Sequence, residues 1–156
     1  MVTADLPAAH AWLQAQALVR ADKIGSIDFC LGGRVAFLAN AVLPLAAAVS
    51  YYGGGTHPLK DRAANPHAQH LLYRGGLNAH IRKEYVIEVT AGVEAAGKPF
   101  VNTIISYAGH SFHRDERASH HPPSASCRRG VGTDADLLQG KAGRLGWFLL
   151  RSCLSY

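Results

Sequence analysis

The sequence predicts an α/β protein in which helices cover both faces of a parallel β-sheet. Short apolar runs alternate with helical segments along most of the chain, as they do where helices join parallel strands. Each apolar run ends in a glycine-rich or polar loop. Of the 156 residues, 48% are hydrophobic and 17% are charged, a balance that supports a packed core and excludes intrinsic disorder.

Three helices and four strands are predicted, in the chain order 5–19 (helix), 23–29 (strand), 32–42 (helix), 46–52 (strand), 70–73 (strand), 80–96 (helix) and 100–107 (strand). The first helix lacks glycine, with Asp5 as its cap and Pro7 in its first turn. The second ends near Pro44, and the third is amphipathic and stops at Gly97. Because a helix joins the first two strands, we expect them to pair in parallel.

The charge balance gives little support for a nucleic-acid partner. The formal charge is +5, but part of the basic excess lies in residues 114–156, and no stripe of Lys and Arg interleaved with aromatic residues is present. The longest apolar stretch, 35–49, is interrupted by Asn40 and Pro44 and is shorter than the ~20 residues of a membrane helix. We therefore expect neither nucleic acid nor membrane as a partner.

The cysteines indicate a reducing compartment. The three cysteines, Cys30, Cys127 and Cys153, cannot all pair, and none belongs to a CxxC motif of the kind that binds structural zinc. The N-terminal residues also lack the basic and apolar regions of a signal peptide. These observations predict a cytoplasmic protein.

Cys30 is the candidate nucleophile. It lies between a predicted strand and a predicted helix and is followed by Gly32 and Gly33, as in the sharp turn that lifts a nucleophile above a sheet. The positive N-terminal end of the helix favours a thiolate, and the backbone N–H of Leu31 is the predicted oxyanion donor. A small buried core residue is the alternative interpretation of such a cysteine.

Asn78 and His110 complete the candidate site. Each follows the end of a later strand, so the order along the chain is nucleophile, acid position, histidine. A histidine in this place is the expected base, because imidazole titrates near neutral pH. We expect the three side chains to converge at the C-terminal edge of the sheet. A solvated surface group is the alternative for a lone loop histidine.

Linked motifs make a family resemblance specific. The runs FCLGGR, SYYGGG, YRGGLNAHI and GHSFHRDER resemble the dienelactone hydrolase (carboxymethylenebutenolidase) family, over about residues 5 to 122. The resemblance implies the C-terminal part of an α/β-hydrolase fold without a cofactor or metal, and a monomer. It implies that Cys30 attacks a small lactone or ester to form an acyl-enzyme, that His110 is the base, and that Arg114 anchors the substrate carboxylate.

Four departures separate this chain from the family pattern. Asn78 stands at the position of the triad aspartate; its amide can accept from imidazole, but it carries no charge and can also donate. Asp28 replaces the first elbow glycine and is expected to crowd the turn. The N-terminal strands are missing, and the resemblance stops near Pro123. We therefore predict a partial domain over 1–122 and a frame-shifted, poorly ordered or loosely packed tail over 123–156.

Two other functions remain open at this level. The first is a catalytically inactive remnant or fragment of such a hydrolase, which the departures at positions 28 and 78 favour. The second is metal binding, since four histidines fall within a short stretch: His110, His113, His120 and His121. The predicted site contains no metal, because this stretch lies within the hydrolase motif.

Overall fold

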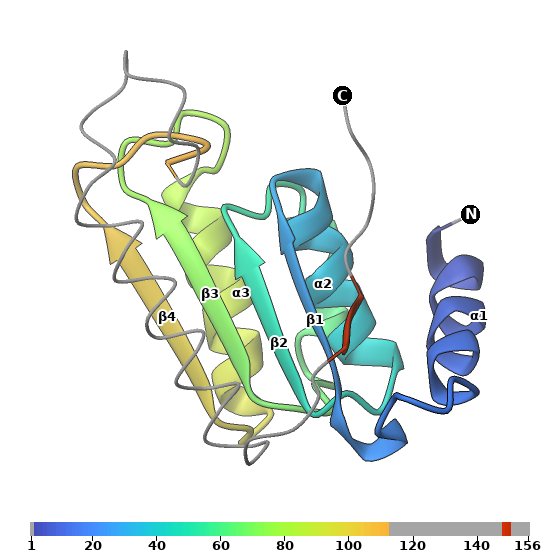
Figure 1. Cartoon of the computed structure of the whole chain (residues 1–156). Helices are drawn as coiled ribbons and strands as arrows, with labels where there is room; N and C mark the ends of the chain where they lie inside the picture. Colours follow the sequence, from blue (N-terminus) through green and yellow to red (C-terminus); the bar gives the residue numbers. More distant parts are fainter. Residues whose placement is uncertain (1, 113–147, 151–156) are drawn as a thin grey trace.

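A single parallel β-sheet carries the architecture. The structure, a computed structural model, describes residues 2–112 and 148–150 (Figure 1). The strands are β1 (Ile24–Phe29), β2 (Ala47–Tyr51), β3 (His70–Gly75), β4 (Phe100–Ile105) and β5 (Phe148–Leu150). They lie in the order β4-β3-β2-β1-β5, and every neighbouring pair is parallel. Gly25 pairs with Ala47 and Phe29 with Tyr51, so the predicted pairing of the first two strands is confirmed.

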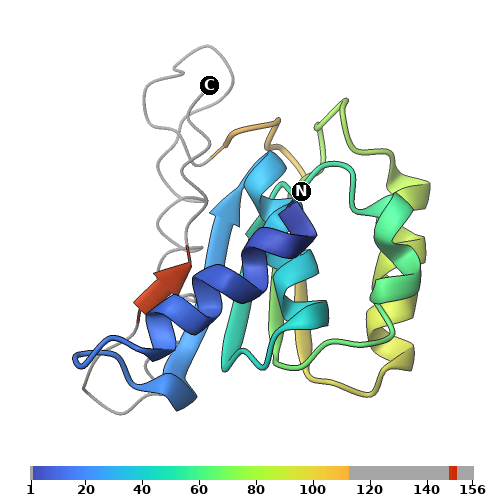
Figure 2. The ribbon, with the colours of Figure 1, turned by 90° about the vertical axis from the view of Figure 1, so that its right-hand side faces the viewer.

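The helices are α1 (Val2–Gln14), α2 (Leu31–Val42) and α3 (Lys83–Ala95), with the 3-10 segments η1 (Ala21–Lys23) and η2 (His57–Arg62). Figures 1 and 2 show α2 and α3 against the same face of the sheet, with α1 beside α2. Within residues 2–112 and 148–150 no helix covers the other face, so a second helical layer stays a prediction. No helix in these ranges has the length and apolarity needed to cross a membrane.

Two helix boundaries differ from the prediction for local reasons. α1 begins at Val2, so Asp5 lies within its first turn instead of capping it, and Pro7 lies inside the helix. The helix ends at Gln14 because the side chain of Gln16 donates to the carbonyl of Trp12 over 2.8 Å, while the Gln16 backbone N–H tightens onto Leu13. α3 begins at Lys83 and not at His80, because residues 78–81 form a turn closed by Asn78.

Apolar side chains pack on both faces of the sheet. Between α1, α2 and β1 lie Leu6, Leu13, Ile24, Leu38 and Leu43, and between α2, α3 and β3 lie Phe37, Leu72, Val89 and Val93. The opposite face carries Val49, Tyr51, Leu71 and Tyr73, all buried. There the rings of Phe29, Tyr51 and Tyr73 stack in succession across three strands, with neighbouring centroids 4.8 Å apart.

A buried polar network ties α2 to β2 and β3. His70 lies between Asn40, whose Nδ2 donates to Nδ1 over 3.2 Å, and Ser50, whose Oγ is 2.9 Å from Nε2. Ser50 donates onward to the carbonyl of Gly33 over 2.7 Å, and Asn40 exchanges two bonds with the backbone of Ala68. Each side chain of this network is therefore hydrogen-bonded, as burial requires.

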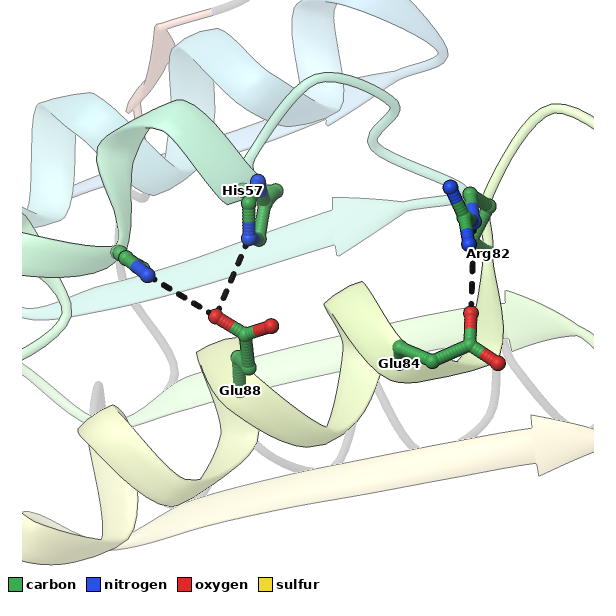
Figure 3. Close-up of polar contacts among 5 residues, drawn as sticks. His57, Arg82, Glu84 and Glu88 are labelled. Atoms are coloured by element: carbon green, nitrogen blue, oxygen red, sulfur yellow. Dashed lines mark hydrogen bonds and ion pairs between the residues drawn. The ribbon is translucent and has the colours of Figure 1, made fainter.

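Exposed charged groups hold η2 against α3 (Figure 3). The carboxylate of Glu88 accepts from Lys60 over 3.0 Å and from His57 over 3.1 Å. The ring of His57 also stacks on Tyr85, with centroids 3.9 Å apart. The hydrogen bond from Lys60 holds the pKa of Glu88 below its ordinary value. Because these charges are open to solvent, they position the segment more than they stabilise it.

Protonation of His70 is expected to destabilise the fold. Burial, and then the nearby positive charge of Arg74, lowers the pKa of His70 to about 3. The folded protein therefore favours the neutral ring of His70. The resulting contribution to the free energy of unfolding is complete above the unfolded-state pKa of about 6.5, and it is lost as the pH falls from there towards 3. Denaturant unfolding at stepped pH should show up to about 1.4 kcal/mol lost per pH unit in this window. In a His70→Gln variant this pH-dependent loss of stability should be absent. An equal slope of unfolding free energy against pH in the wild type and the variant would contradict the role given to His70.

Replacing Arg74 by methionine is expected to stabilise the protein. Arg74 is only 4% exposed, and its Nε has no hydrogen-bond partner within the described part of the chain. Burial lowers its pKa to about 10, so the side chain is still charged at neutral pH. Arg74→Met should raise the free energy of unfolding by about 1–3 kcal/mol, because it removes a buried charge whose Nε has no hydrogen-bond partner among the described residues. The exposed Arg62→Met is the control, and a fall in stability for Arg74→Met would contradict the argument.

Candidate active site

Cys30 occupies a strained turn between β1 and α2. Its backbone has φ 55° and ψ −121°, a conformation that costs a non-glycine residue about 1–3 kcal/mol. Two backbone bonds hold the turn: Cys30 donates to the carbonyl of Tyr51 and Gly33 donates to the carbonyl of Cys30, both over 3.0 Å. The thiol is exposed at the N-terminal end of α2, which corresponds to the turn predicted from the sequence.

Glycines allow this turn to pack closely. A β-carbon on Gly33 would lie 2.8 Å from the carbonyl oxygen of Tyr51 and 2.9 Å from Cα of Gly53, so the start of α2 touches the end of β2 backbone to backbone. Gly75 and Gly76 fit against the carbonyls of Ala108 and Ser106 in the same way. These contacts fix the three loops that carry the candidate residues.

Asp28 does not prevent the elbow from forming. Its buried carboxylate lies where a β-carbon on Gly32 would be, and Oδ1 accepts from the N–H of Phe29 over 2.8 Å. The crowding expected at this position is therefore taken up by the missing side chain of Gly32. The two residues share one volume on the helical side of the turn.

The predicted convergence of three side chains is confirmed as geometry. Sγ of Cys30 lies 3.1 Å from Nε2 of His110, and Nδ1 of the same ring lies 3.0 Å from Nδ2 of Asn78. Asn78 is buried, and its Oδ1 accepts from the N–H of His80 over 3.0 Å. The backbone N–H of Leu77 donates to the carbonyl of Ala108 over 2.9 Å, which joins the Asn78 loop to the His110 loop.

Two aromatic side chains around His110 were missed by the sequence interpretation. The ring of Tyr52 stands edge-on to His110 at 5.1 Å, and the ring of His80 does so at 5.2 Å. Both lie in loops that sequence reasoning had already marked, one residue after β2 and two residues after Asn78. Their place in loops at the C-terminal edge of the sheet was therefore the sequence feature that could have identified them.

The remaining predicted site residues have different outcomes. Leu31 begins α2, so its N–H belongs to the first helical turn, where backbone N–H groups have no acceptor within the helix. Arg114 lies outside the described residues, as do His113, His120 and His121 of the metal alternative. Among the residues that are described, no three His, Cys, Asp or Glu side chains are grouped so as to hold a metal ion.

Gly33→Ala is expected to disrupt the elbow. The new β-carbon would press on the backbone of Tyr51 and Gly53, and overpacking of this kind costs about 1–3 kcal/mol. Gly54→Ala is the matched control, since nothing lies within 4 Å of its added β-carbon. Gly33→Ala should lower the free energy of unfolding in urea and change the rate of Cys30 alkylation, and Gly54→Ala should do neither. Equal behaviour of the two variants would show that the close approach is not needed.

Comparison with known proteins supports the same family as the motifs. Residues 1–130 match the Dienelactone hydrolase family. A Bradyrhizobium protein assigned as a 2-oxo-3-(5-oxofuran-2-ylidene)propanoate lactonase is 31% identical over 134 residues, which cover 80% of this chain and 54% of that protein. The chain thus spans about half the length of such curated relatives.

Solved structures show the same fold. A Klebsiella pneumoniae protein assigned as a dienelactone hydrolase has 29% identity and a TM-score of 0.76, covering 86% of this chain and 59% of that one. The dienelactone hydrolase-like promiscuous phosphotriesterase P91 from metagenomic libraries has 22% identity and a TM-score of 0.78, covering 87% and 59%, and shares the fold. The predicted α/β-hydrolase fold is thereby confirmed. By its motifs, its fold and its match over residues 1–130, the chain belongs to the dienelactone hydrolase family.

Proposed function

We propose that this chain hydrolyses a small lactone or ester through the thiol of Cys30 and an acyl-enzyme. The observation that carries the proposal is the 3.1 Å contact between Sγ of Cys30 and Nε2 of His110 at a strained turn. A nucleophile and a histidine within hydrogen-bond reach are the signature of nucleophilic catalysis. The backbone strain at Cys30 supports a functional role, since such outliers cluster at active sites.

The proposed reaction has two steps. The sulfur attacks the carbonyl carbon, the N–H of Leu31 donates to the developing oxyanion, and the bond to the leaving oxygen breaks to give a thioester. Water then attacks the thioester, the carbon–sulfur bond breaks, and a carboxylic acid and the free thiol are formed. His110 carries the proton between these groups as the base. Arg114 binds a substrate carboxylate, a role that suits a bidentate guanidinium.

Family and composition support the substrate class and the setting. The Bradyrhizobium relative is assigned as a lactonase, which favours a lactone or an activated ester as the substrate of this chain. Three cysteines that cannot all pair favour a reducing, cytoplasmic setting in which the Cys30 thiol stays available. The contacts of Cys30, His110 and Asn78 favour an active hydrolase over an inactive remnant.

The purified chain is expected to hydrolyse para-nitrophenyl acetate in a Cys30-dependent manner. Cys30→Ala should lower the rate by at least about 10³-fold, the scale on which loss of a nucleophile acts. Cys153→Ala is the control and should leave the rate unchanged, because the proposed reaction gives that cysteine no role. Mass spectrometry of the quenched reaction should find the acetyl group on the peptide that contains Cys30.

Two results would overturn the proposal. One is a rate that is equal in the wild type and in Cys30→Ala, because the observed hydrolysis would then come from another group. The other is acylation at a different residue. His110→Ala should also lower the acylation rate, by about 10²–10⁴-fold if the ring moves the proton.

A further inference from the structure

A backbone group orients the side-chain amide of Asn78. The N–H of His80 lies 3.0 Å from one amide atom of Asn78, and a backbone N–H can only donate. The atom facing it is therefore the oxygen Oδ1. The nitrogen Nδ2 must then be the atom that lies 3.0 Å from Nδ1 of His110. Asn78 is buried, so reversing the amide would set two donors face to face without solvent to compensate.

This orientation determines where His110 carries its proton. Nδ2 of Asn78 donates, so Nδ1 of His110 has to accept with its lone pair. A neutral imidazole has one protonated nitrogen, which leaves the proton on Nε2. Nε2 is the atom that faces Sγ of Cys30, 3.1 Å away. The ring therefore presents an N–H to the sulfur and has no free lone pair on that side.

We propose that Asn78 is a positioning residue that donates to His110 and holds its ring protonated on Nε2, which restricts the hydrolase to substrates whose leaving oxygen departs as a stable anion. Phenyl esters and enol lactones have such leaving groups, and alkyl esters do not. The part about substrates rests on the proposed function. The part about the ring rests only on the three contacts among Cys30, Asn78, His80 and His110.

The proton balance explains the restriction. The thiol of Cys30 gives its proton to solvent, and the N–H of His110 donates to the resulting thiolate. The thiolate attacks the carbonyl carbon, and the electron pair of the breaking carbon–oxygen bond leaves on oxygen. Protonating that oxygen from neutral His110 would leave an imidazolate anion, so the oxygen departs as the anion and takes a proton from water. In this step His110 is therefore a hydrogen-bond donor to the thiolate and not the base of the two-step scheme.

An aspartate at position 78 would behave differently. A carboxylate can accept from the N–H of His80 and from a protonated Nδ1 of His110 at the same time, which no orientation of an amide can do. The ring would then have a lone pair on Nε2 to take the thiol proton, and the resulting imidazolium could protonate the leaving oxygen. Asn78→Asp preserves the size of the side chain, adds a negative charge and changes this choice of proton position.

Nitrogen NMR of the imidazole tests the ring directly. In uniformly ¹⁵N-labelled wild type at mildly alkaline pH, Nδ1 of His110 is expected to resonate as an unprotonated nitrogen and Nε2 as a protonated one. Asn78→Asp should reverse this pattern or protonate both nitrogens. The signals are assigned by their loss in His110→Gln. A protonated Nδ1 in the wild type would overturn the inference, whatever the activity.

Ester kinetics test the restriction on substrates. Para-nitrophenyl acetate and ethyl acetate share an acyl group and differ in the leaving oxygen. Asn78→Asp should raise kcat/KM for ethyl acetate about 100-fold more than for para-nitrophenyl acetate, since general acid catalysis contributes about 10²–10⁴-fold. Asn65→Asp, an exposed residue in the loop after η2, adds the same charge and should leave the ratio unchanged. An equal factor on both esters would overturn the restriction.

Failure of the proposed function would be distinguishable from failure of this inference. If no variant hydrolyses para-nitrophenyl acetate through Cys30, the hydrolase proposal fails together with the restriction on substrates. The NMR pattern of His110 still decides whether Asn78 donates to the ring. Cys30-dependent hydrolysis with a protonated Nδ1 would support the hydrolase and reject the role given to Asn78.

Discussion

Gly33 and Gly53 bring the start of α2 and the end of β2 so close together that a β-carbon at position 33 would strike backbone atoms. This contact leaves no slack between strand and helix, so the connecting residue has to turn within one step, and Cys30 takes φ 55°. The buried hydrogen bonds among Ser50, His70 and Asn40 also join α2 to strands β2 and β3. The exposed thiol is thus held by rigid parts of the fold on each side, which is the preorganisation that its proposed role as a nucleophile requires.

A second pair of close contacts does the same for the other side of the site. Gly75 and Gly76 let the loop after β3 lie directly on the loop after β4, and Leu77 bonds to Ala108 across them. Asn78 and His110 are therefore held at a fixed separation although they are 32 positions apart in the sequence. Close backbone contacts between the loops therefore fix the positions of the side chains in the site.

Much of this was readable in the sequence because it depends on local pattern. Apolar runs between glycines predicted the four strands β1 to β4, and their order along the chain predicted that Cys30, Asn78 and His110 would converge. Side-chain choices within loops were less readable: the capping of Trp12 by Gln16 shortened α1, and the turn at Asn78 delayed α3. The orientation of the Asn78 amide depends on the N–H of His80, whose position is set by the three-dimensional turn and not by a local sequence pattern. The pairing of β5 with β1 joins residues far apart in sequence, so no local sequence pattern predicts it.

Asp28 and Gly32 occupy one volume, and this couples the effects of substitutions at the two positions. A β-carbon at position 32 would meet the carboxylate of Asp28, so a larger residue there requires that carboxylate to move from its contact with the N–H of Phe29. Substitutions at positions 28 and 32 are therefore expected to have non-additive effects on stability.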